Sequence, residues 1–306
     1  MRPDLGRIPA VTTSQGAVTP AAGLRLVPAL LGLVRFQHTV FALPFALAGA
    51  LLARHAVPSL ERLLWIVLAM AGARSLAMAL NRLIDARIDG LNPRTAGREL
   101  PSGRLRRGQV LVFAAVSLGI LLLAVSQLPP LTWYLWPIPV AAFVIYPYTK
   151  RFTWACHIVL GLTIGMAPVG GWIAVTGTID PAAIVLGAGV AAWIAGFDVI
   201  YALLDVDFDR QHGIHSIPAR FGATGALWFA RGSHLAAIAL LAAGGLMAGA
   251  GAIYLLGIVV IAIILGYENA IVRPADPASI QKAFGSANAL ISVVYLAFVL
   301  AEVTLS

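Results

Sequence analysis

The chain has 306 residues, of which 60% are hydrophobic and 11% are charged, and its mean hydropathy is +0.89. Soluble domains carry about 25% charged residues, so this composition excludes an ordinary soluble protein and predicts a polytopic protein of the lipid bilayer. The net charge of +8 is compatible with nucleic-acid binding, but the positions of the charges favour a role in membrane topology, and no nucleic-acid partner is expected. The single cysteine, Cys156, excludes a disulfide framework and a cysteine-based metal site.

The predicted elements begin after a polar tail. Residues 1–24 are rich in Pro, Gly, Ser and Thr and lack an apolar core, so we expect a mobile tail that is not a secretory signal, followed by one transmembrane domain over residues 25–306. Apolar runs long enough to cross the hydrocarbon core occur near residues 36–54, 62–84, 108–126, 131–147, 154–175, 181–203, 226–247, 250–269 and 284–304. Strand-like alternation is absent from these runs, so the predicted fold is all-α, a single bundle of nine transmembrane helices.

Lysine and arginine are divided unevenly between the predicted loops. With the N-terminus inside, one face receives 18 of the 21 basic residues, and only Arg54, Arg62 and Arg74 fall elsewhere. The loop from Arg82 to Arg107 alone holds seven arginines. Because basic residues accumulate on the cytoplasmic side of membrane proteins, this face is predicted to be cytoplasmic, with the N-terminus inside and the C-terminus outside.

A first acidic motif follows the second predicted span. Asn81, Asp85 and Asp89 are spaced four residues apart, and residues at this spacing share one face of an α-helix. Arg74 lies seven residues before Asn81 and therefore falls on the same face, about two turns deeper. A charged arginine at that depth is expected to point into the bundle towards an anion or a carboxylate.

A second acidic motif, formed by Asp198, Tyr201, Asp205 and Asp209, ends the sixth predicted span. The spacing again favours one helix face, on the same side of the membrane as the first motif. Two such groups of carboxylates repel each other unless a cation lies between them, and carboxylates in or near a membrane are costly and usually functional. Oxygen ligands from Asn and Asp suit a hard cation such as Mg²⁺, which shares its coordination shell with phosphate oxygens.

The basic loops supply groups for a phosphate. Arg94 and Arg98 lie in the loop after the first acidic motif, and Lys150 and Arg151 lie in the next loop on the same face. Guanidinium groups donate in a fork that matches diphosphate oxygens. Basic loops alone are equally typical of a topology signal, but their pairing with two acidic motifs favours a site for a cation and a diphosphate.

The histidines do not indicate a metal site. The six histidines are scattered without the spacing of metal ligands, so a histidine-based metal centre is not expected. His215 is noted as an exception, because it follows the second acidic motif by six residues. The roles of His215 and Arg74 stay open.

These motifs resemble those of the UbiA superfamily of intramembrane aromatic prenyltransferases. The family's N-x-x-x-D-x-x-x-D motif matches residues 81–89, and its D-x-x-Y-A-x-x-D-x-x-x-D motif matches residues 198–209. The R-T-x-x-R-x-L-P-S-G loop matches residues 94–103, and the Y-P-x-x-K-R motif matches residues 146–151. The resemblance covers almost everything after the tail and implies nine helices around a central cavity.

The resemblance implies Mg²⁺-dependent transfer of a polyprenyl group from polyprenyl diphosphate to an aromatic acid, 4-hydroxybenzoate, in quinone biosynthesis. It also implies a bacterial cytoplasmic (inner) membrane enzyme whose site faces the cytoplasm. The implied metal ligands are Asn81, Asp85, Asp89, Asp205 and Asp209, and the implied diphosphate ligands are Arg94, Arg98, Lys150 and Arg151. Asp198 and Tyr201 are the implied catalytic residues that orient or activate the phenol or shield the allylic cation, and Arg35 is the implied contact for the aromatic carboxylate.

Two positions depart from the family's patterns and leave the acceptor open. Many members that act on 4-hydroxybenzoate have Asn-Asp where this chain has Asn81-Arg82, and some relatives have Lys in a stretch like Gly213-Ile-His-Ser216. A dihydroxynaphthoate of a menaquinone pathway is therefore an alternative acceptor, and haem farnesylation is another.

Other protein classes fit the sequence less well. A membrane transporter places polar groups near mid-membrane, whereas here the acids gather towards one face beside basic loops. The Asp-Gly-x-x-Ala-Arg run of CDP-alcohol phosphotransferases and the Gly-x-Gly-Asp signature of intramembrane aspartyl proteases are both missing.

Overall fold

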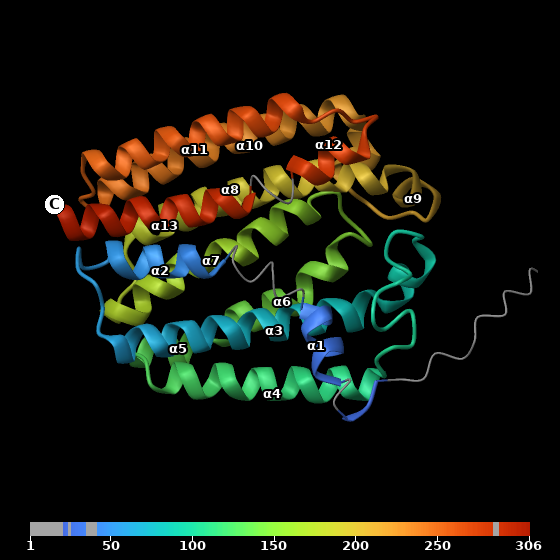
Figure 1. Cartoon of the computed structure of the whole chain (residues 1–306), viewed down its shortest axis with the longest axis horizontal. Coiled ribbons are helices and arrows are strands. Elements are labelled where there is room, and N and C mark those ends of the chain that lie inside the picture. The colour runs from blue at the N-terminus through green and yellow to red at the C-terminus, as the bar shows by residue number, and fades with distance from the viewer. Residues whose placement is uncertain (1–20, 24–25, 35–41, 284–287) are drawn as a thin grey trace, which may run out of the picture.

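The computed structural model describes residues 21–23, 26–34, 42–283 and 288–306, and all regular secondary structure in these ranges is helical, as predicted. The long helices lie side by side in one bundle (Figure 1). The elements are α1 (Leu26–Val34), α2 (Leu43–Leu52), α3 (Leu60–Leu91), α4 (Arg107–Ser126), α5 (Pro130–Leu135), α6 (Pro137–Thr149), α7 (Cys156–Thr176), α8 (Pro181–Ala202), the 3₁₀-helix η3 (Leu203–Asp205), α9 (Val206–Gln211), α10 (Ile217–Met247), α11 (Ala252–Ile271), α12 (Pro277–Lys282) and α13 (Asn288–Leu305).

Four apolar clusters lie in the described part of the bundle, and two of them are the largest. One of these joins α2, α8, α11 and α13, where the ring of Phe45 packs against the rings of Trp193 and Tyr295. The other joins α3, α4 and α6 through residues such as Leu76, Leu121 and Phe143. Helices within a bilayer associate mainly through van der Waals packing of such side chains and through interhelical hydrogen bonds, because lipid tails are as apolar as the side chains themselves. α7 and α8 on one side and α3 and α6 on the other both line the candidate site described below.

Six helices of the described ranges are long and apolar enough to cross a membrane: α3, α4, α7, the segment Pro181–Gln211, α10 and α11. α2 and residues Leu290–Leu305 of α13 are apolar but shorter. The fourth predicted span, residues 131–147, is divided at Trp136 into α5 and α6. Pro137 explains the division because its nitrogen has no hydrogen to continue the bonding of α5. Nine crossings and their direction stay a prediction.

The two acidic motifs differ in how well their helices were predicted. The predicted span near residues 62–84 lies within α3, which continues to Leu91 and carries the whole first acidic motif, as the spacing of the motif predicted. The second motif was expected on one continuous helix, and this is wrong: α8 ends at Ala202, and the turn η3 leads into the short helix α9. Asp205 and Asp209 therefore follow a break in the helix, although they line the same cavity as Tyr201.

Small residues bring α7 and α8 into close contact. Gly161 and Gly165 of α7 face α8 so closely that a Cβ atom at Gly161 would lie 2.3 Å from the carbonyl oxygen of Ala191. This spacing of two glycines four residues apart is a common interface between membrane helices. The close contact fixes the position of Asp198 and Tyr201, on α8, against the start of α7.

Residues 1–24 were predicted to form a mobile tail, and the transmembrane domain was predicted to begin at residue 25. Residues 1–20 and 24 of that tail lie outside the described residues. Within the described part, the backbone of Ala21 bonds to the backbone of Arg104 and to the side chain of Gln109. The short helix α1, which the sequence did not predict as a separate element, packs on α3.

Candidate active site

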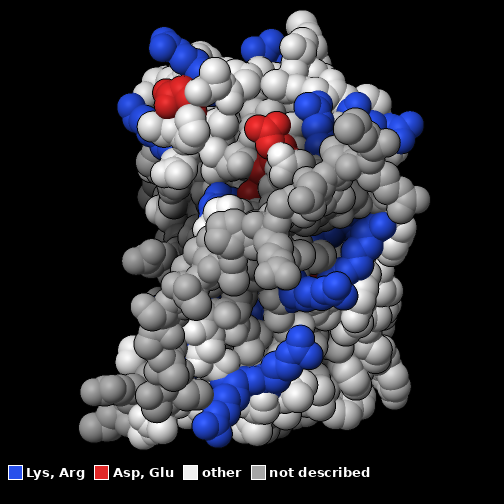
Figure 2. Space-filling model, turned by 90° about the vertical axis from the view of Figure 1, so that its right-hand side faces the viewer, with Lys and Arg blue, Asp and Glu red and all other residues white. Residues whose placement is uncertain are grey.

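A cavity of about 340 Å³ lies between α3, α6, α7 and α8, near the loops that follow α3, α6 and α9. Both acidic motifs contribute to its wall, and so do the loops that were predicted to bind phosphate. The predicted site residues that line it are Asn81, Asp85, Asp89, Arg94, Arg98, Lys150, Asp198, Tyr201, Asp205 and Asp209. Figure 2 shows acidic side chains surrounded by basic ones on this end of the molecule.

The first acidic motif lies on one face of α3, as predicted. Asn81, Asp85 and Asp89 all line the cavity, and the two aspartates are buried. The amide nitrogen of Asn81 donates a hydrogen bond to Asp85 Oδ2 at 3.1 Å. α3 is unbroken along this stretch, so its backbone bonds fix the spacing of all three side chains.

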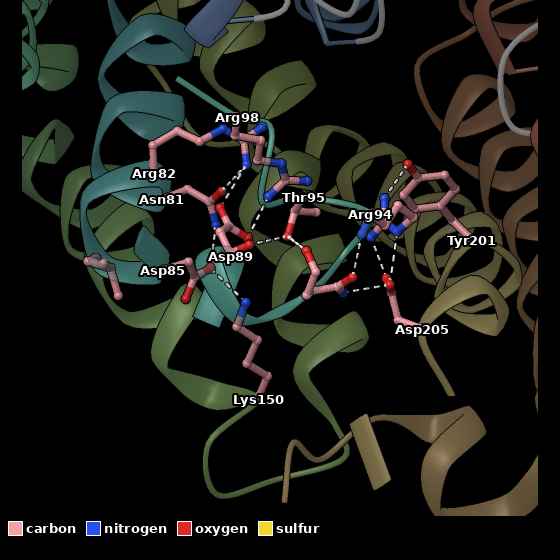
Figure 3. Close-up of polar contacts among 12 residues, drawn as sticks. Asn81, Arg82, Asp85, Asp89, Arg94, Thr95, Arg98, Lys150, Tyr201 and Asp205 are labelled. Carbon is pink, nitrogen blue, oxygen red and sulfur yellow. Dashed lines mark hydrogen bonds and ion pairs between the residues drawn. The ribbon is translucent and has the colours of Figure 1, made fainter. Parts of the chain in front are cut away.

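Asp85 is held by two basic residues from the loop after α6. Lys150 Nζ lies 2.7 Å from Asp85 Oδ2, and Arg151 Nη2 lies 3.1 Å from Asp85 Oδ1 (Figure 3 shows the contact of Lys150). Arg151 also donates to the carbonyl oxygens of Ile84 and Pro147, which fixes its guanidinium group. The structure therefore brings these three predicted residues together across 65 or more residues of sequence.

Asp89 pairs with the loop that follows α3. Arg98 Nη1 donates to Asp89 Oδ1 at 2.7 Å, and the hydroxyl of Thr95 donates to the backbone oxygen of Asp89 at 2.9 Å (Figure 3). Arg82 Nη1 lies 3.8 Å from Asp89 Oδ2. That second oxygen is buried and has no hydrogen-bond donor, so it is available to a further ligand.

The second acidic motif meets the first through Arg94. Arg94 Nε donates to Asp205 Oδ1 at 2.8 Å, its Nη2 bonds to Asp205 Oδ2, and its Nη1 donates to the hydroxyl oxygen of Tyr201 at 2.8 Å (Figure 3). Asn92 also donates to Asp205 Oδ1, at 2.9 Å. Burial by itself lowers the pKa of Arg94, but the bonds and charge of Asp205 outweigh it, so the net pKa is raised and Arg94 stays charged.

The other two carboxylates of the second motif have different partners. Asp209 is buried and accepts a 2.8 Å hydrogen bond from the hydroxyl of Ser216, the residue that caps α10. Asp198 lies 2.8 Å from Nδ1 of His157, the second residue of α7. Asp198 is thus the member of the two motifs that pairs with an imidazole.

The sequence also singled out Arg35, Arg74 and His215. Arg35 lies outside the described residues, so its contact with an aromatic carboxylate stays a prediction. Arg74 lines the deeper part of the cavity, and its Nε atom is buried without a hydrogen-bond partner. His215 also lines the cavity, and its backbone nitrogen bonds to the carbonyl oxygen of Lys150.

The predicted site residues did not include Asn92, Thr95 and His157, which also line the cavity. Asn92 and Thr95 belong to the loop whose arginines drew attention, and an asparagine before Pro93 is typical of a turn. His157 lies 41 residues from its partner Asp198, so only the packing of α7 on α8 reveals the pair.

The residues fit a hard divalent cation, although no group of three carboxylate, histidine or cysteine side chains is assembled for a metal within the described ranges. The candidate donors are oxygens of Asn81 and four aspartates, as Mg²⁺ prefers. Asp89 Oδ2, which accepts no hydrogen bond, is one of the candidate donors. Asp85 and Asp205 are instead neutralised by basic side chains.

Comparison with known protein families gives a match that covers most of the chain. The model of the UbiA prenyltransferase family matches residues 42–296. That range contains both acidic motifs and every residue named in the cavity wall.

Curated relatives with this similarity are prenyltransferases. The 4-hydroxybenzoate octaprenyltransferase of Alkalilimnicola ehrlichii is 30% identical over 258 residues, which cover 82% of this chain and 86% of the relative. The protoheme IX farnesyltransferase of Methylococcus capsulatus is 35% identical over 218 residues, which cover 69% of this chain and 71% of the relative. Relatives with two different acceptors thus match the same chain.

Solved structures share the fold. An apo UbiA homologue from Aeropyrum pernix is 33% identical with a TM-score of 0.79, and the match covers 86% of this chain and 97% of that one. A UbiA homologue from Archaeoglobus fulgidus bound to DMAPP and Mg²⁺ is 20% identical with a TM-score of 0.68, and the match covers 91% of this chain and 100% of that one. The second likeness shows the fold alone.

Proposed function

The chain belongs to the UbiA prenyltransferase family and is an integral membrane enzyme, and from this we propose that it transfers a polyprenyl group from polyprenyl diphosphate to an aromatic acid of the 4-hydroxybenzoate type in quinone biosynthesis. The observation that carries the proposal is the single cavity lined by two acidic motifs and by the basic residues of two loops. A diphosphate and its counter-cations need these two kinds of side chain together.

Mg²⁺ is the proposed cofactor, and its proposed ligands are Asn81, Asp85, Asp89, Asp205 and Asp209. When bound, the ion supplies positive charge that stabilises the departing diphosphate. The structure of the Archaeoglobus fulgidus homologue with DMAPP and Mg²⁺ is consistent with this choice, and so is the purely oxygen-based donor set.

Four basic residues are proposed to bind the diphosphate: Arg94, Arg98, Lys150 and Arg151. The C–O bond of the prenyl diphosphate breaks with both electrons on the leaving oxygen, so negative charge grows on the diphosphate and positive charge on the allylic carbon. Stabilisation of growing charge by fixed groups in a site of low dielectric is usually a large catalytic contribution. Tyr201, whose ring lies 4.9 Å below the guanidinium of Arg94, is proposed to hold that arginine in place.

The deeper part of the cavity suits the acceptor. Ile164, Ile194 and Phe197 supply apolar surface for a ring and an isoprenoid chain, and Arg74 supplies a cation whose Nε lacks a partner. An acid with a carboxylate opposite its phenol would reach Arg74 with its charged end while the ring faces Asp198. Asp198 is the proposed acceptor of the proton that the ring loses after the new C–C bond forms.

The cavity is proposed to face the cytoplasm of a bacterial inner membrane. Most basic residues belong to the loops around it, and loops of this kind remain on the cytoplasmic side. Water-soluble acceptors and Mg²⁺ would then enter from the cytoplasm, while the prenyl chain enters from the bilayer.

The test is a product assay in membranes that contain the expressed protein. A labelled polyprenyl diphosphate is incubated with 4-hydroxybenzoate, a dihydroxynaphthoate or protohaem, with Mg²⁺ or with EDTA, and the lipid products are identified by mass spectrometry. We expect a prenylated 4-hydroxybenzoate that disappears in EDTA. A prenylated naphthoate would change the acceptor, a farnesylated haem would support the function of the Methylococcus capsulatus relative, and movement of substrate without any covalent product would indicate a transporter.

A further inference from the structure

We propose that His157 is a positioning residue that acts through Asp198: its Nδ1–H group holds the Asp198 carboxylate turned towards the acceptor ring. The inference rests on the proposed function and assigns a role to a histidine that the sequence motifs do not include. It concerns the loss of the ring proton, not the binding of the cation or the diphosphate.

The contact between the two residues is short and sheltered. His157 is buried, and its Nδ1 atom lies 2.8 Å from Asp198 Oδ2. At this distance a proton must lie between the two atoms, since two lone pairs would repel each other. The other ring nitrogen, Nε2, is buried without a partner, so the imidazole is oriented from its Nδ1 side, where Asp198 lies.

Asp198 remains open to the cavity on its other side. Its side chain is 26% exposed and lines the cavity wall, whereas the imidazole behind it is 6% exposed. One carboxylate oxygen is therefore fixed by His157 while the other can meet a substrate. A base that is held in one orientation needs less reorganisation when the proton is transferred.

The partner of Asp198 differs from the partners of the other paired aspartates. Asp85, Asp89 and Asp205 each bond to lysine or arginine, as expected where charge must be neutralised. A guanidinium against Asp198 would lower its basicity more strongly and would compete with the acceptor for its oxygens. An imidazole supplies one directed bond and leaves the second oxygen free.

The ring proton leaves after the new C–C bond has formed. The prenyl C–O bond breaks with both electrons on the diphosphate, and a π pair of the ring forms the new C–C bond. The ring C–H bond then breaks, its electron pair restores the aromatic ring, and its proton goes to the cavity-facing oxygen of Asp198. His157 keeps its bond to the other oxygen throughout, and the proton leaves Asp198 for water at the open side of the cavity.

The test compares substitutions of His157 in the purified full-length enzyme. His157→Leu removes the bond and is expected to lower kcat by about 10- to 100-fold, as for other partners that orient a functional group, while KM for the prenyl diphosphate changes less than twofold. His157→Asn keeps a donor at the δ position and is expected to recover most of the loss. Deuterium on the ring carbon that is prenylated should lower the turnover rate of His157→Leu by a larger factor than it lowers the rate of the wild type.

Two comparisons separate this role from a structural one. His234 is another buried histidine, on α10, and it does not line the cavity, so His234→Leu controls for loss of a buried imidazole and should show no new isotope effect. In an enzyme that already carries Asp198→Asn, adding His157→Leu should lower kcat no further. A lower kcat that is additive with Asp198→Asn, or that comes with an equal loss of prenyl diphosphate binding, overturns the proposal.

Failure of the inference and failure of the proposed function are distinguishable. If the wild-type enzyme prenylates no aromatic acid, the proposed function fails. If the wild type is active and His157→Leu equals it in kcat and isotope effect, only the role of His157 is refuted.

Discussion

The two acidic motifs line the same cavity but are built differently. The first lies on α3, an unbroken helix, whereas the second is divided between α8, the turn η3 and the short helix α9. The side chains of Asp85 and Asp89 are 2% and 7% exposed, and those of Asp205 and Asp198 are 16% and 26% exposed. The aspartates of the first motif are thus both sheltered, whereas the second motif is more open at Asp198 and Asp205 and sheltered only at Asp209.

The side chains that contact the two motifs also differ in charge. The first motif is surrounded by Lys150, Arg151, Arg98 and Arg82, all cationic. The second has one arginine, one asparagine, one histidine and one serine. We propose a division of labour. α3 supplies a fixed anionic site for the cation, whereas α8, η3 and α9 supply further metal ligands and the groups that meet the acceptor.

The loop after α3 joins the two halves. Arg94 reaches Asp205 and Tyr201, while Arg98 of the same loop reaches Asp89. In both contacts, a carboxylate that is proposed to bind Mg²⁺ is neutralised by an arginine that is proposed to bind the diphosphate. If Mg²⁺ bound to the carboxylates and the diphosphate to the arginines, every charged group would still have an opposite charge beside it. A buried charge without such a partner is costly.

The largest effect is expected at the sheltered motif. Asp85→Asn leaves Lys150 and Arg151 without a carboxylate and removes a proposed metal ligand, so Mg²⁺-dependent prenyl transfer should fall about 1000-fold. The rate in detergent-solubilised enzyme at increasing Mg²⁺ concentration measures it. Asp207→Asn is the matched control, because Asp207 is exposed on α9 and does not line the cavity. Undiminished turnover of Asp85→Asn would remove α3 from the metal site.

A smaller loss is expected at the more open motif. Asp205→Asn should lower the same rate about 100-fold, since Asp205 is partly exposed and water can replace part of its interaction. The comparison with Asp85→Asn is direct when both are measured at saturating Mg²⁺. A loss at Asp205 that exceeds the loss at Asp85 would contradict the view of α3 as the more rigid half.

Part of this arrangement was predictable from the sequence. The spacing of Asn81, Asp85 and Asp89 gave their common face correctly because α3 is a regular helix, and the basic loops were correctly placed beside the acids. The same spacing rule failed at Asp205, since nothing in Leu-Leu-Asp marks a 3₁₀ turn. The pair of His157 and Asp198 was missed because it depends on contact between two helices that glycines allow.

The link between the halves is tested by Arg94→Ala. This change removes bonds to Asp205 and Tyr201 and a proposed diphosphate ligand, so KM for the prenyl diphosphate should rise about 10-fold with a smaller change in kcat. Arg87→Ala is the control, because Arg87 is an exposed arginine of α3 outside the cavity wall. An unchanged KM in Arg94→Ala would assign that arginine to topology alone.

The smallest effect is expected at the edge of the second motif. Ser216→Ala removes the hydrogen bond that holds Asp209 Oδ2, worth about 1 kcal/mol, and should raise the Mg²⁺ concentration for half-maximal rate about fivefold. Titration of the rate with Mg²⁺ measures this shift. Because Ser216 also caps α10, thermal stability is recorded in parallel, and a fall in stability without a shift in the Mg²⁺ response would limit Ser216 to the cap.

The most direct test of the shared site is an experimental structure of the enzyme with Mn²⁺ and a non-hydrolysable prenyl diphosphate analogue, in which anomalous scattering locates the metal. We expect Mn²⁺ inside the cavity, with carboxylate oxygens from both α3 and the η3–α9 segment and with the diphosphate beside it. Mn²⁺ bound by one motif alone, or outside the cavity, would contradict the claim that the two motifs act together on one diphosphate.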